Sequence, residues 1–168
     1  MKHDILIREV IQDGEKKMIS RQILEALPDW FEVPEAREEY IRSSEGKPFF
    51  AAFRGQVPVG FLYLKETGKA TVELAVMGVL KEVHRQGIGR ALFLAAKDRA
   101  AEAGYEFMQV KTVRMGVYDD YDRTNRFYQS LGFREFEVIP VVWGEENPCQ
   151  IYVMSLIIPD RTEETDRA

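Results

Sequence analysis

Two glycines and two arginines lie close together in a segment that could bind an anion. Gly87 and Gly89 flank Ile88 at the point where an amphipathic helical pattern begins. The first turn of a helix has backbone N–H groups without partners, and the helix dipole adds partial positive charge there. Glycine leaves those N–H groups accessible to a phosphate, and Arg85 and Arg90 add charge. The segment therefore predicts a phosphate site, although close packing of the helix would also account for the glycines.

Two well-known nucleotide-binding patterns do not fit this segment. The dinucleotide pattern Gly-x-Gly-x-x-Gly would need a third glycine where the chain has Leu92. The P-loop pattern would need Gly-Lys-Ser/Thr after the glycines, and that triplet does not follow. A protein that uses this loop for a nucleotide or a free phosphate is thus the least supported alternative.

The composition is that of an ordered globular protein. The chain has 168 residues, of which 45% are hydrophobic and 30% are charged, and we expect one domain over residues 1–158 followed by a polar tail at 159–168. The net charge of −5 argues against nucleic acid as a partner, because phosphate-binding surfaces are usually basic. An acidic protein remains compatible with a cationic substrate.

Cysteine, histidine and hydropathy exclude further classes of protein. Cys149 is the only cysteine, so no intrachain disulfide forms, and we expect it to pack in the interior. His3 and His84 have no cysteine pair beside them, so no metal site is predicted. No apolar run reaches the roughly 18–20 residues needed to span a bilayer, and the first ten residues lack a signal-peptide core. We therefore expect a cytoplasmic protein with no membrane partner.

Hydrophobic periodicity predicts the element order β-α-α-β-β-β-α-β-α-β-β, a mixed sheet with helices on both faces in the α/β or α+β class. Helices are expected before Pro28, after Pro34, from Gly87 to about Gly104 and in the ten or so residues before Gly132. The strand after the third helix follows a crossover connection and should run parallel to the strand before it. The strands are expected at residues 4–10, 48–53, 57–64, 70–80, 106–111, 133–143 and 149–158.

Two motifs in this order resemble the GNAT acetyltransferase superfamily. Residues 84–89, His-Arg-Gln-Gly-Ile-Gly, resemble its acyl-CoA loop, Gln/Arg-x-x-Gly-x-Gly/Ala, with His84 standing where Gln or Arg is usual. Residues 127–133, Phe-Tyr-Gln-Ser-Leu-Gly-Phe, resemble the end of the family's late helix, which often carries a Tyr before Leu-Gly-Phe. The element order also fits, so the resemblance covers nearly the whole chain. It implies a mostly antiparallel sheet with a central parallel strand pair.

The resemblance implies that the chain uses acetyl-CoA as acyl donor and transfers the acetyl group to a primary amine. Backbone groups of the strand before the loop would hold the pantetheine arm, and Gly78 could mark a bulge there. Tyr121 stands where family members commonly have an Asn that contacts this arm. The residues expected to bind the cofactor are Met77, Gly78, Val79, His84, Arg85, Gln86, Gly87, Ile88, Gly89, Arg90 and Tyr121.

Two residues are predicted to be catalytic. Tyr128 in the second motif is the candidate general acid for the thiolate, since a phenol carries its proton at neutral pH; the alternative is a tyrosine of the core. Glu73 is the candidate general base, as the only acid in residues 70–80, and strand alternation places it on the side of Ala75 and Met77. The alternative for Glu73 is a strand residue that faces solvent.

The acceptor is expected to be a small cationic amine. Aromatic and acidic residues would rim its site between the first helices and the last hairpin, and the sequence offers Asp29, Trp30, Phe31, Tyr40, Trp143, Glu145 and Glu146. Other functions stay open: a degenerate module that only binds acyl-CoA, or an enzyme that acetylates a protein or peptide. The final strands could also offer an edge through which two copies pair as a homodimer.

Overall fold

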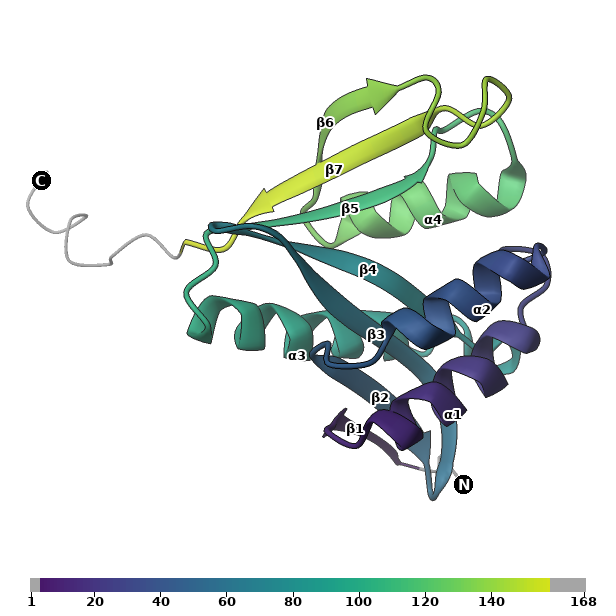
Figure 1. Ribbon diagram of the computed structural model, residues 1–168, viewed down its shortest axis with the longest axis vertical. Coiled ribbons are helices and arrows are strands. Elements are labelled where there is room, and N and C mark those ends of the chain that lie inside the picture. The colour runs from purple at the N-terminus through teal and green to yellow at the C-terminus, as the bar shows by residue number, and fades with distance from the viewer. Residues whose placement is uncertain (1–3, 158–168) are drawn as a thin grey trace, which may run out of the picture.

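The computed structural model describes residues 4–157, which form a seven-stranded sheet with helices on both faces (Figure 1). The strand order is β1-β2-β3-β4-β5-β7-β6, and every neighbouring pair is antiparallel except β4 and β5, which are parallel. This confirms the predicted fold class. The strands are β1 (Ile5–Val10), β2 (Phe49–Arg54), β3 (Val57–Gly68), β4 (Thr71–Val79), β5 (Phe107–Val113), β6 (Arg134–Ile139) and β7 (Cys149–Ser155).

Each face of the sheet packs against its own pair of helices. On one face lie α1 (Asp13–Glu25) and α2 (Pro34–Ser43), whose buried residues include Ile19, Ile23 and Ile41. On the other lie α3 (Ile88–Glu102) and α4 (Asp119–Ser130), which bury Leu92 and Tyr128 among others. None of the helices in residues 4–157 is long and apolar enough to cross a membrane. The sheet is thus the middle layer of three.

The elements follow the predicted order, and the largest differences in boundary are at the ends of β3, β6 and β7. β3 continues to Gly68, beyond the predicted end at residue 64, as it pairs with β4. β6 ends at Ile139, where a strand to residue 143 was expected. Pro140 follows at once, and proline cannot donate a hydrogen bond to a neighbouring strand. β7 ends at Ser155, before the predicted end at residue 158, and the predicted tail at 159–168 lies outside the described residues.

β4 contains a bulge at Ala75. Tyr63 of β3 pairs with Val76 and Leu64 pairs with Leu74, so Ala75 has no partner in the register. A bulge shifts the alternation of side chains by one residue. Accordingly, Leu74 belongs to the core beneath α3 and α4, whereas Val76 belongs to the core beneath α1 and α2.

The bulge corrects two predictions about β4. The predicted bulge at Gly78 is wrong, because Gly78 pairs in regular register and its missing side chain leaves room for Ile23, 3.0 Å from the position of a Cβ. The prediction that Glu73 shares a face with Met77 is also wrong. Met77 packs on the α3 side, whereas Glu73, next to Leu74, points to the α1–α2 side.

The parallel strands β4 and β5 separate soon after they meet. They pair only where Thr71–Glu73 faces Phe107–Gln109, although β4 continues to Val79 and β5 to Val113. Figure 1 shows the two strands diverging towards α2 and α4. From Leu74 onwards, the β5-facing edge of β4 has no strand partner among residues 4–157. We call the region between Leu74–Val79 of β4 and Val110–Val113 of β5, where these two strands no longer pair with each other, the β4–β5 wedge.

Candidate active site

The N-terminus of α3 lies just after β4 and is open to an anion. Gly87 is the N-cap with φ of 77°, and no side chain caps the helix. The first helical bond runs from the Ala91 N–H to the Gly87 carbonyl, so the N–H groups of Ile88, Gly89 and Arg90 have no partner inside the helix. A Cβ on Gly87 would meet no atom within 4 Å, and the first turn has no acidic residue. These features are typical of a phosphate-binding helix start.

Gly89 has a different role from Gly87. A Cβ on Gly89 would lie 2.9 Å from Cζ of Phe127 and 3.1 Å from Cε of Met77. Gly89 thus lets α3 approach both α4 and β4. The packing interpretation thus applies to Gly89, whereas the space beside Gly87 is open and its role in binding phosphate stays a prediction.

We expect Gly89→Ala to destabilise the protein by about 1–3 kcal/mol, because the added methyl group overlaps the Phe127 ring in a packed interior. Gly14→Ala is the matched control: Gly14 lies in α1, and a Cβ there meets no atom within 4 Å. Urea unfolding of both variants measures the difference. Equal midpoints would show that Phe127 moves aside at no cost.

The two arginines of the loop are exposed. Within residues 4–157, neither Arg85 nor Arg90 takes part in an ion pair, so both charges are available to a ligand. Arg85 has φ of 62°, a left-handed conformation that costs a non-glycine residue about 1–2 kcal/mol. Such strain is often found at binding sites. Gln86 is also exposed beside them.

The side chain of His84 is directed along the end of β4. Its Nε2 lies 2.7 Å from the carbonyl oxygen of Val79. A carbonyl only accepts hydrogen bonds, so Nε2 carries a proton and donates it. The imidazole also meets the Trp30 ring edge-on, with 6.0 Å between centroids. Both contacts are with protein groups, and contact of this side chain with the cofactor stays a prediction.

Tyr128 lies on α4 against the sheet and is 8% exposed. Its ring packs against Phe133 and Tyr152, at centroid distances of 5.9 and 6.3 Å. Burial, and to a lesser extent the nearby Tyr121, raises the pKa of the Tyr128 phenol well above its usual range. The hydroxyl makes no hydrogen bond with any residue of the described part of the chain. Tyr128 is therefore a protonated donor that is free to meet a ligand.

Glu73 lies on the opposite face, 9% exposed, and forms an ion pair with Lys111 of β5 at 3.0 Å. Burial raises the pKa of the phenols of Tyr40 in α2 and Tyr63 in β3. The nearby Glu73 carboxylate contributes to both shifts. Glu73 is thus not the solvent-facing strand residue of the alternative. It belongs to a polar cluster between α2 and the wedge.

Tyr121 connects α4 to the loop at residues 26–33, which joins α1 to α2. Its hydroxyl donates to the carbonyl of Trp30 at 3.1 Å. Burial raises the pKa of this phenol, and Tyr40 contributes. The Tyr121 hydroxyl, which was predicted to contact the pantetheine arm, thus donates a hydrogen bond to the loop at residues 26–33, which was expected to contact the acceptor. Its contact with the cofactor stays a prediction.

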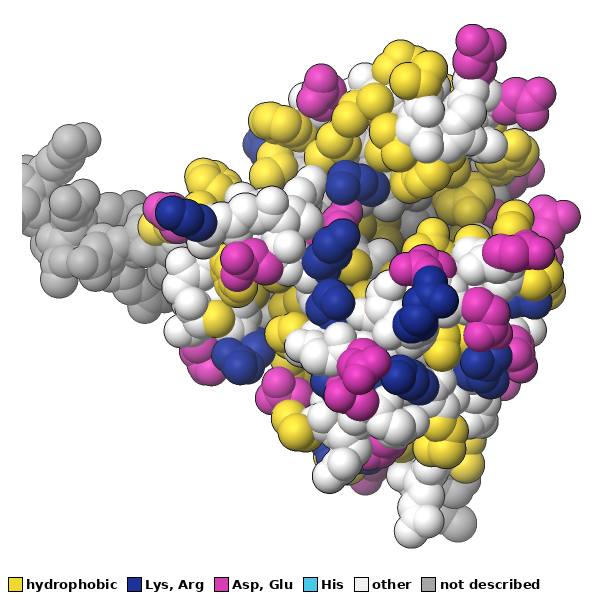
Figure 2. All heavy atoms as spheres, viewed as in Figure 1, with side chains coloured by type: hydrophobic (Ala, Val, Ile, Leu, Met, Phe, Trp, Pro, Cys, Tyr) yellow, Lys and Arg dark blue, Asp and Glu magenta, His cyan; other side chains and the backbone are white. Residues whose placement is uncertain are grey.

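The other residues predicted to rim the acceptor site divide into two groups. Asp29 pairs with Lys81, and the Phe31 ring packs edge-on against Tyr40 at 6.0 Å, so these belong to the α1–α2 side. Trp143, Glu145 and Glu146 lie exposed in the loop between β6 and β7. Figure 2 shows the surface hollowed between the part built on β5–β7 and the part built on α1 and α2, with apolar side chains lining the hollow.

Cys149 packs in the interior at 0% exposure, as expected, and its burial raises the pKa of the thiol. In residues 4–157, no three His, Cys, Asp or Glu side chains gather into a group that could hold a metal ion.

The model of the "Acetyltransferase (GNAT) family" matches residues 16–133 of the chain. That span includes the loop of α3, the wedge and Tyr128. The chain belongs to the GNAT acetyltransferase family. No curated protein sequence matches it significantly.

Solved structures share the fold of this GNAT chain at low sequence identity. A protein from Desulfovibrio desulfuricans, assigned to the GNAT family, superposes with a TM-score of 0.81 at 18% identity, over 92% of this chain and 100% of its own. The aminoglycoside 6'-N-acetyltransferase from Enterococcus faecium gives 0.73 at 18% identity, over 92% and 99%. A GNAT family acetyltransferase from Elizabethkingia anophelis with acetyl-CoA bound gives 0.69 at 18% identity, also over 92% and 99%.

Two residues that contact the candidate site were missed by sequence reasoning. Asn125 is fully buried on α4; its amide donates to the carbonyls of Val113 at 2.8 Å and Tyr121 at 2.7 Å, and its oxygen accepts from the Tyr152 hydroxyl at 2.6 Å. It ties α4 to the end of β5 and so fixes one side of the wedge. A polar residue on the face of the helix that carries Tyr128 was the available signal. Lys111 was missed because its partner lies 38 positions away in the chain and on another strand.

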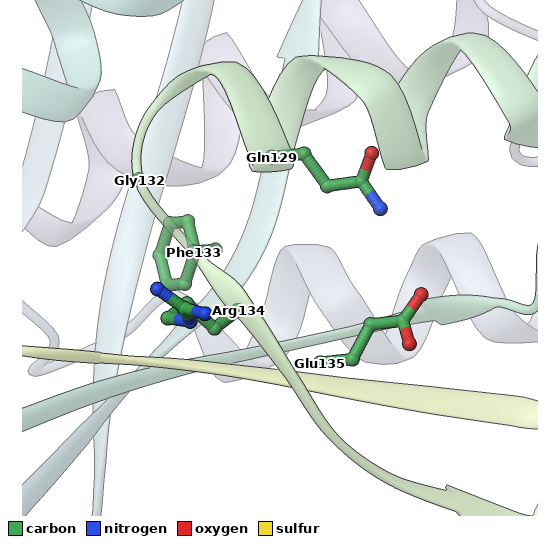
Figure 3. Close-up of a pocket in the computed structure, with 5 residues that line it drawn as sticks. All are labelled: Gln129, Gly132, Phe133, Arg134 and Glu135. Atoms are coloured by element: carbon green, nitrogen blue, oxygen red, sulfur yellow. The ribbon is translucent and has the colours of Figure 1, made fainter.

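A separate pocket lies between the end of α4 and the start of β6 (Figure 3). Gln129, Gly132, Phe133, Arg134 and Glu135 line it, and none of these was predicted to act in the GNAT reaction. The Gln129 and Glu135 side chains extend in the same direction, whereas Arg134 points the other way. This pocket lacks the open helix start found at α3.

Proposed function

We propose that the chain transfers an acetyl group from acetyl-CoA to the primary amine of a small cationic molecule. One observation carries the proposal: the unpaired edge of β4 leads directly into the open N-terminus of α3. An extended thioester arm can add to such an edge as a further strand, while its diphosphate meets the helix start. Both parts of one long cofactor therefore have a place along one continuous piece of chain.

The cofactor would bind along the stretch from Leu74 to Arg90. The pantetheine arm would use backbone groups of Met77, Gly78 and Val79, although the Val79 carbonyl already accepts from His84. The diphosphate would take the free N–H groups of Ile88, Gly89 and Arg90 and the charge of the exposed arginines. The structure solved with acetyl-CoA bound, from Elizabethkingia anophelis, supports acetyl-CoA as donor.

The reaction needs a neutral amine, a polarised thioester and a protonated leaving group. Glu73 takes the proton of the ammonium, directly or through water, and the freed amine attacks the thioester carbonyl. A C–N bond forms as the C–S bond breaks, and Tyr128 donates its proton to the departing thiolate. The second proton, which the nitrogen loses as it becomes an amide, returns through water to the Tyr128 phenolate. The two residues lie on opposite faces of the sheet, so the reacting atoms would meet at the β4–β5 wedge, where the faces are not separated by strand pairing.

The proposed acceptor is cationic because of the groups on the α1–α2 side of the wedge. Tyr40 and Tyr63 lie near the Glu73 carboxylate, and Phe31 packs edge-on against Tyr40. Aromatic faces attract an ammonium as a carboxylate does. The aminoglycoside 6'-N-acetyltransferase of the same fold acts on such a molecule and supports this class.

Calorimetry with CoA and a thiol-release assay test the proposal together. We expect CoA to bind and acetyl-CoA to release free thiol with at least one of kanamycin, spermidine and tyramine. Tight binding without release on any amine, with a lysine peptide included, would indicate a module that only binds acyl-CoA. Release with the peptide alone would indicate a protein acceptor. Thermal stabilisation by ATP or NAD but not by CoA would indicate a nucleotide-binding protein.

A further inference from the structure

Trp30 lies where three parts of the candidate site meet. It sits in the α1–α2 loop at residues 26–33 and is half-buried. Its carbonyl accepts from the Tyr121 hydroxyl of α4, and its ring meets the His84 imidazole of the loop before α3. Lys81 Nζ lies 5.4 Å from the centroid of the same ring. One residue thus contacts α4 and the loop that leads into the phosphate site.

His84 and Lys81 reach Trp30 from the segment between β4 and α3. Lys81 also pairs with Asp29, the residue before Trp30, so the contact involves both charge and aromatic surface. His84 is held by its hydrogen bond to Val79 at 2.7 Å and presents its ring to the indole. The sheet therefore holds the imidazole through Nε2, and the ring packs against the indole of Trp30 in the α1–α2 loop.

The position of Trp30 affects the residues around Glu73. Phe31 follows Trp30 in the chain, and its ring packs edge-on against Tyr40. Tyr40 in turn is near Glu73, whose carboxylate contributes to the raised pKa of its phenol. Arg37 donates to the carbonyl of Phe31 at 2.9 Å and holds the far side of the loop. A shift of the indole would thus move the aromatic wall of the proposed acceptor site.

We propose that His84 is a positioning residue for the acceptor and not a phosphate ligand, and that it acts by holding Trp30 against the loop before α3. The proposal presupposes the acetyl-transfer function proposed above. His84 departs from the Gln or Arg of the family pattern, and its ring contact with Trp30 is one that neither of those side chains can make in the same form. Tyr121 holds Trp30 from the other side, through the carbonyl.

His84→Gln tests the proposal, because glutamine keeps a donor and removes the ring. We expect the KM for the amine acetylated fastest among kanamycin, spermidine and tyramine to rise about tenfold, a usual size for coupling between neighbouring sites. The calorimetric Kd for CoA should stay within about twofold, because no phosphate contact is lost. Arg85→Gln is the matched control and should do the reverse, raising the Kd for CoA and leaving the KM for the amine.

Trp30→Leu and Tyr121→Phe extend the test to the residue that His84 holds. Trp30→Leu should raise the same KM, and adding His84→Gln should raise it no further, since both changes break one contact. Tyr121→Phe should raise the KM for the amine, because it removes the hydrogen bond to the Trp30 carbonyl. If His84→Gln weakens CoA at unchanged KM, raises both constants equally or changes neither, the positioning role is wrong.

Trp30 fluorescence gives a measurement that needs no turnover. Trp30 and Trp143 are the two tryptophans of the chain, so Trp143→Phe leaves Trp30 as the reporter. In that background, His84→Gln should shift the emission to longer wavelength as the indole becomes more exposed to water. An unchanged spectrum would contradict the contact. Absence of turnover with every amine, by contrast, would count against the proposed function but would not affect the interpretation of the Trp30 emission.

Discussion

Tyr128→Phe is expected to lower kcat by about 100-fold or more, the range usual for removal of a general acid. The phenol is buried and protonated, and its hydroxyl has no partner in the described part of the chain. Its removal therefore costs no protein hydrogen bond, and the thermal midpoint should stay close to that of the wild type. Steady-state kinetics with saturating acetyl-CoA and amine measures the loss.

The Kd for CoA separates catalysis from packing in this variant. It should change by no more than about twofold, because the ring that packs against Phe133 and Tyr152 is kept. The raised pKa of Tyr128 also determines the pH range in which the phenol can act as an acid. The phenol keeps its proton beyond its ordinary pKa of about 10, so its titration should not lower the rate of the wild type below that pH. An unchanged kcat in Tyr128→Phe would rule out the acid role.

Glu73→Gln is expected to lower kcat by about 100-fold. Glutamine has nearly the same shape but cannot take a proton from the ammonium. The kcat at saturating acetyl-CoA and amine is the decisive measurement. An unchanged kcat in Glu73→Gln would show that another group, or water alone, accepts the proton.

Lys111→Met is the control for this variant, because Glu73→Gln also breaks the ion pair with Lys111. The Lys111 side chain is 34% exposed, whereas that of Glu73 is 11% exposed, so Lys111→Met leaves a mostly buried carboxylate without its partner, and the thermal midpoint is measured beside the rate. If the carboxylate is the base, Lys111→Met keeps most of its rate. A loss in Lys111→Met as large as that in Glu73→Gln would assign the effect to the ion pair.

The fold and the places of the two family motifs within it could largely be predicted from the sequence. The Gly87 loop follows a strand and opens a helix, and the Tyr128 motif ends the next helix, so local patterns fix both positions along the chain. The parallel pairing of β4 and β5 followed from a crossover rule. These features depend on residues close together in sequence, which is why a pattern could show them.

The features that could not be predicted depend on contacts between distant residues. No local pattern distinguishes Gly87 from Gly89, because the role of Gly89 is set by Phe127 on another helix. The bulge at Ala75 is visible only in the register with β3, and strand alternation alone put Glu73 and Met77 on one face. His84 fitted the loop motif by position, whereas its ring turned to Trp30, 54 positions earlier in the chain.

The bulge at Ala75 also determines which changes of length β4 can tolerate. Before it, Glu73 faces the layer of α1 and α2; after it, Met77 faces the layer of α3. Deletion of one residue here would restore simple alternation. All side chains on one side of the deletion would then face the opposite layer of helices. Homologous chains should therefore conserve the number of residues between Glu73 and Gly87 more strictly than their identity, because this count keeps the acceptor and the cofactor on their own sides of a single strand.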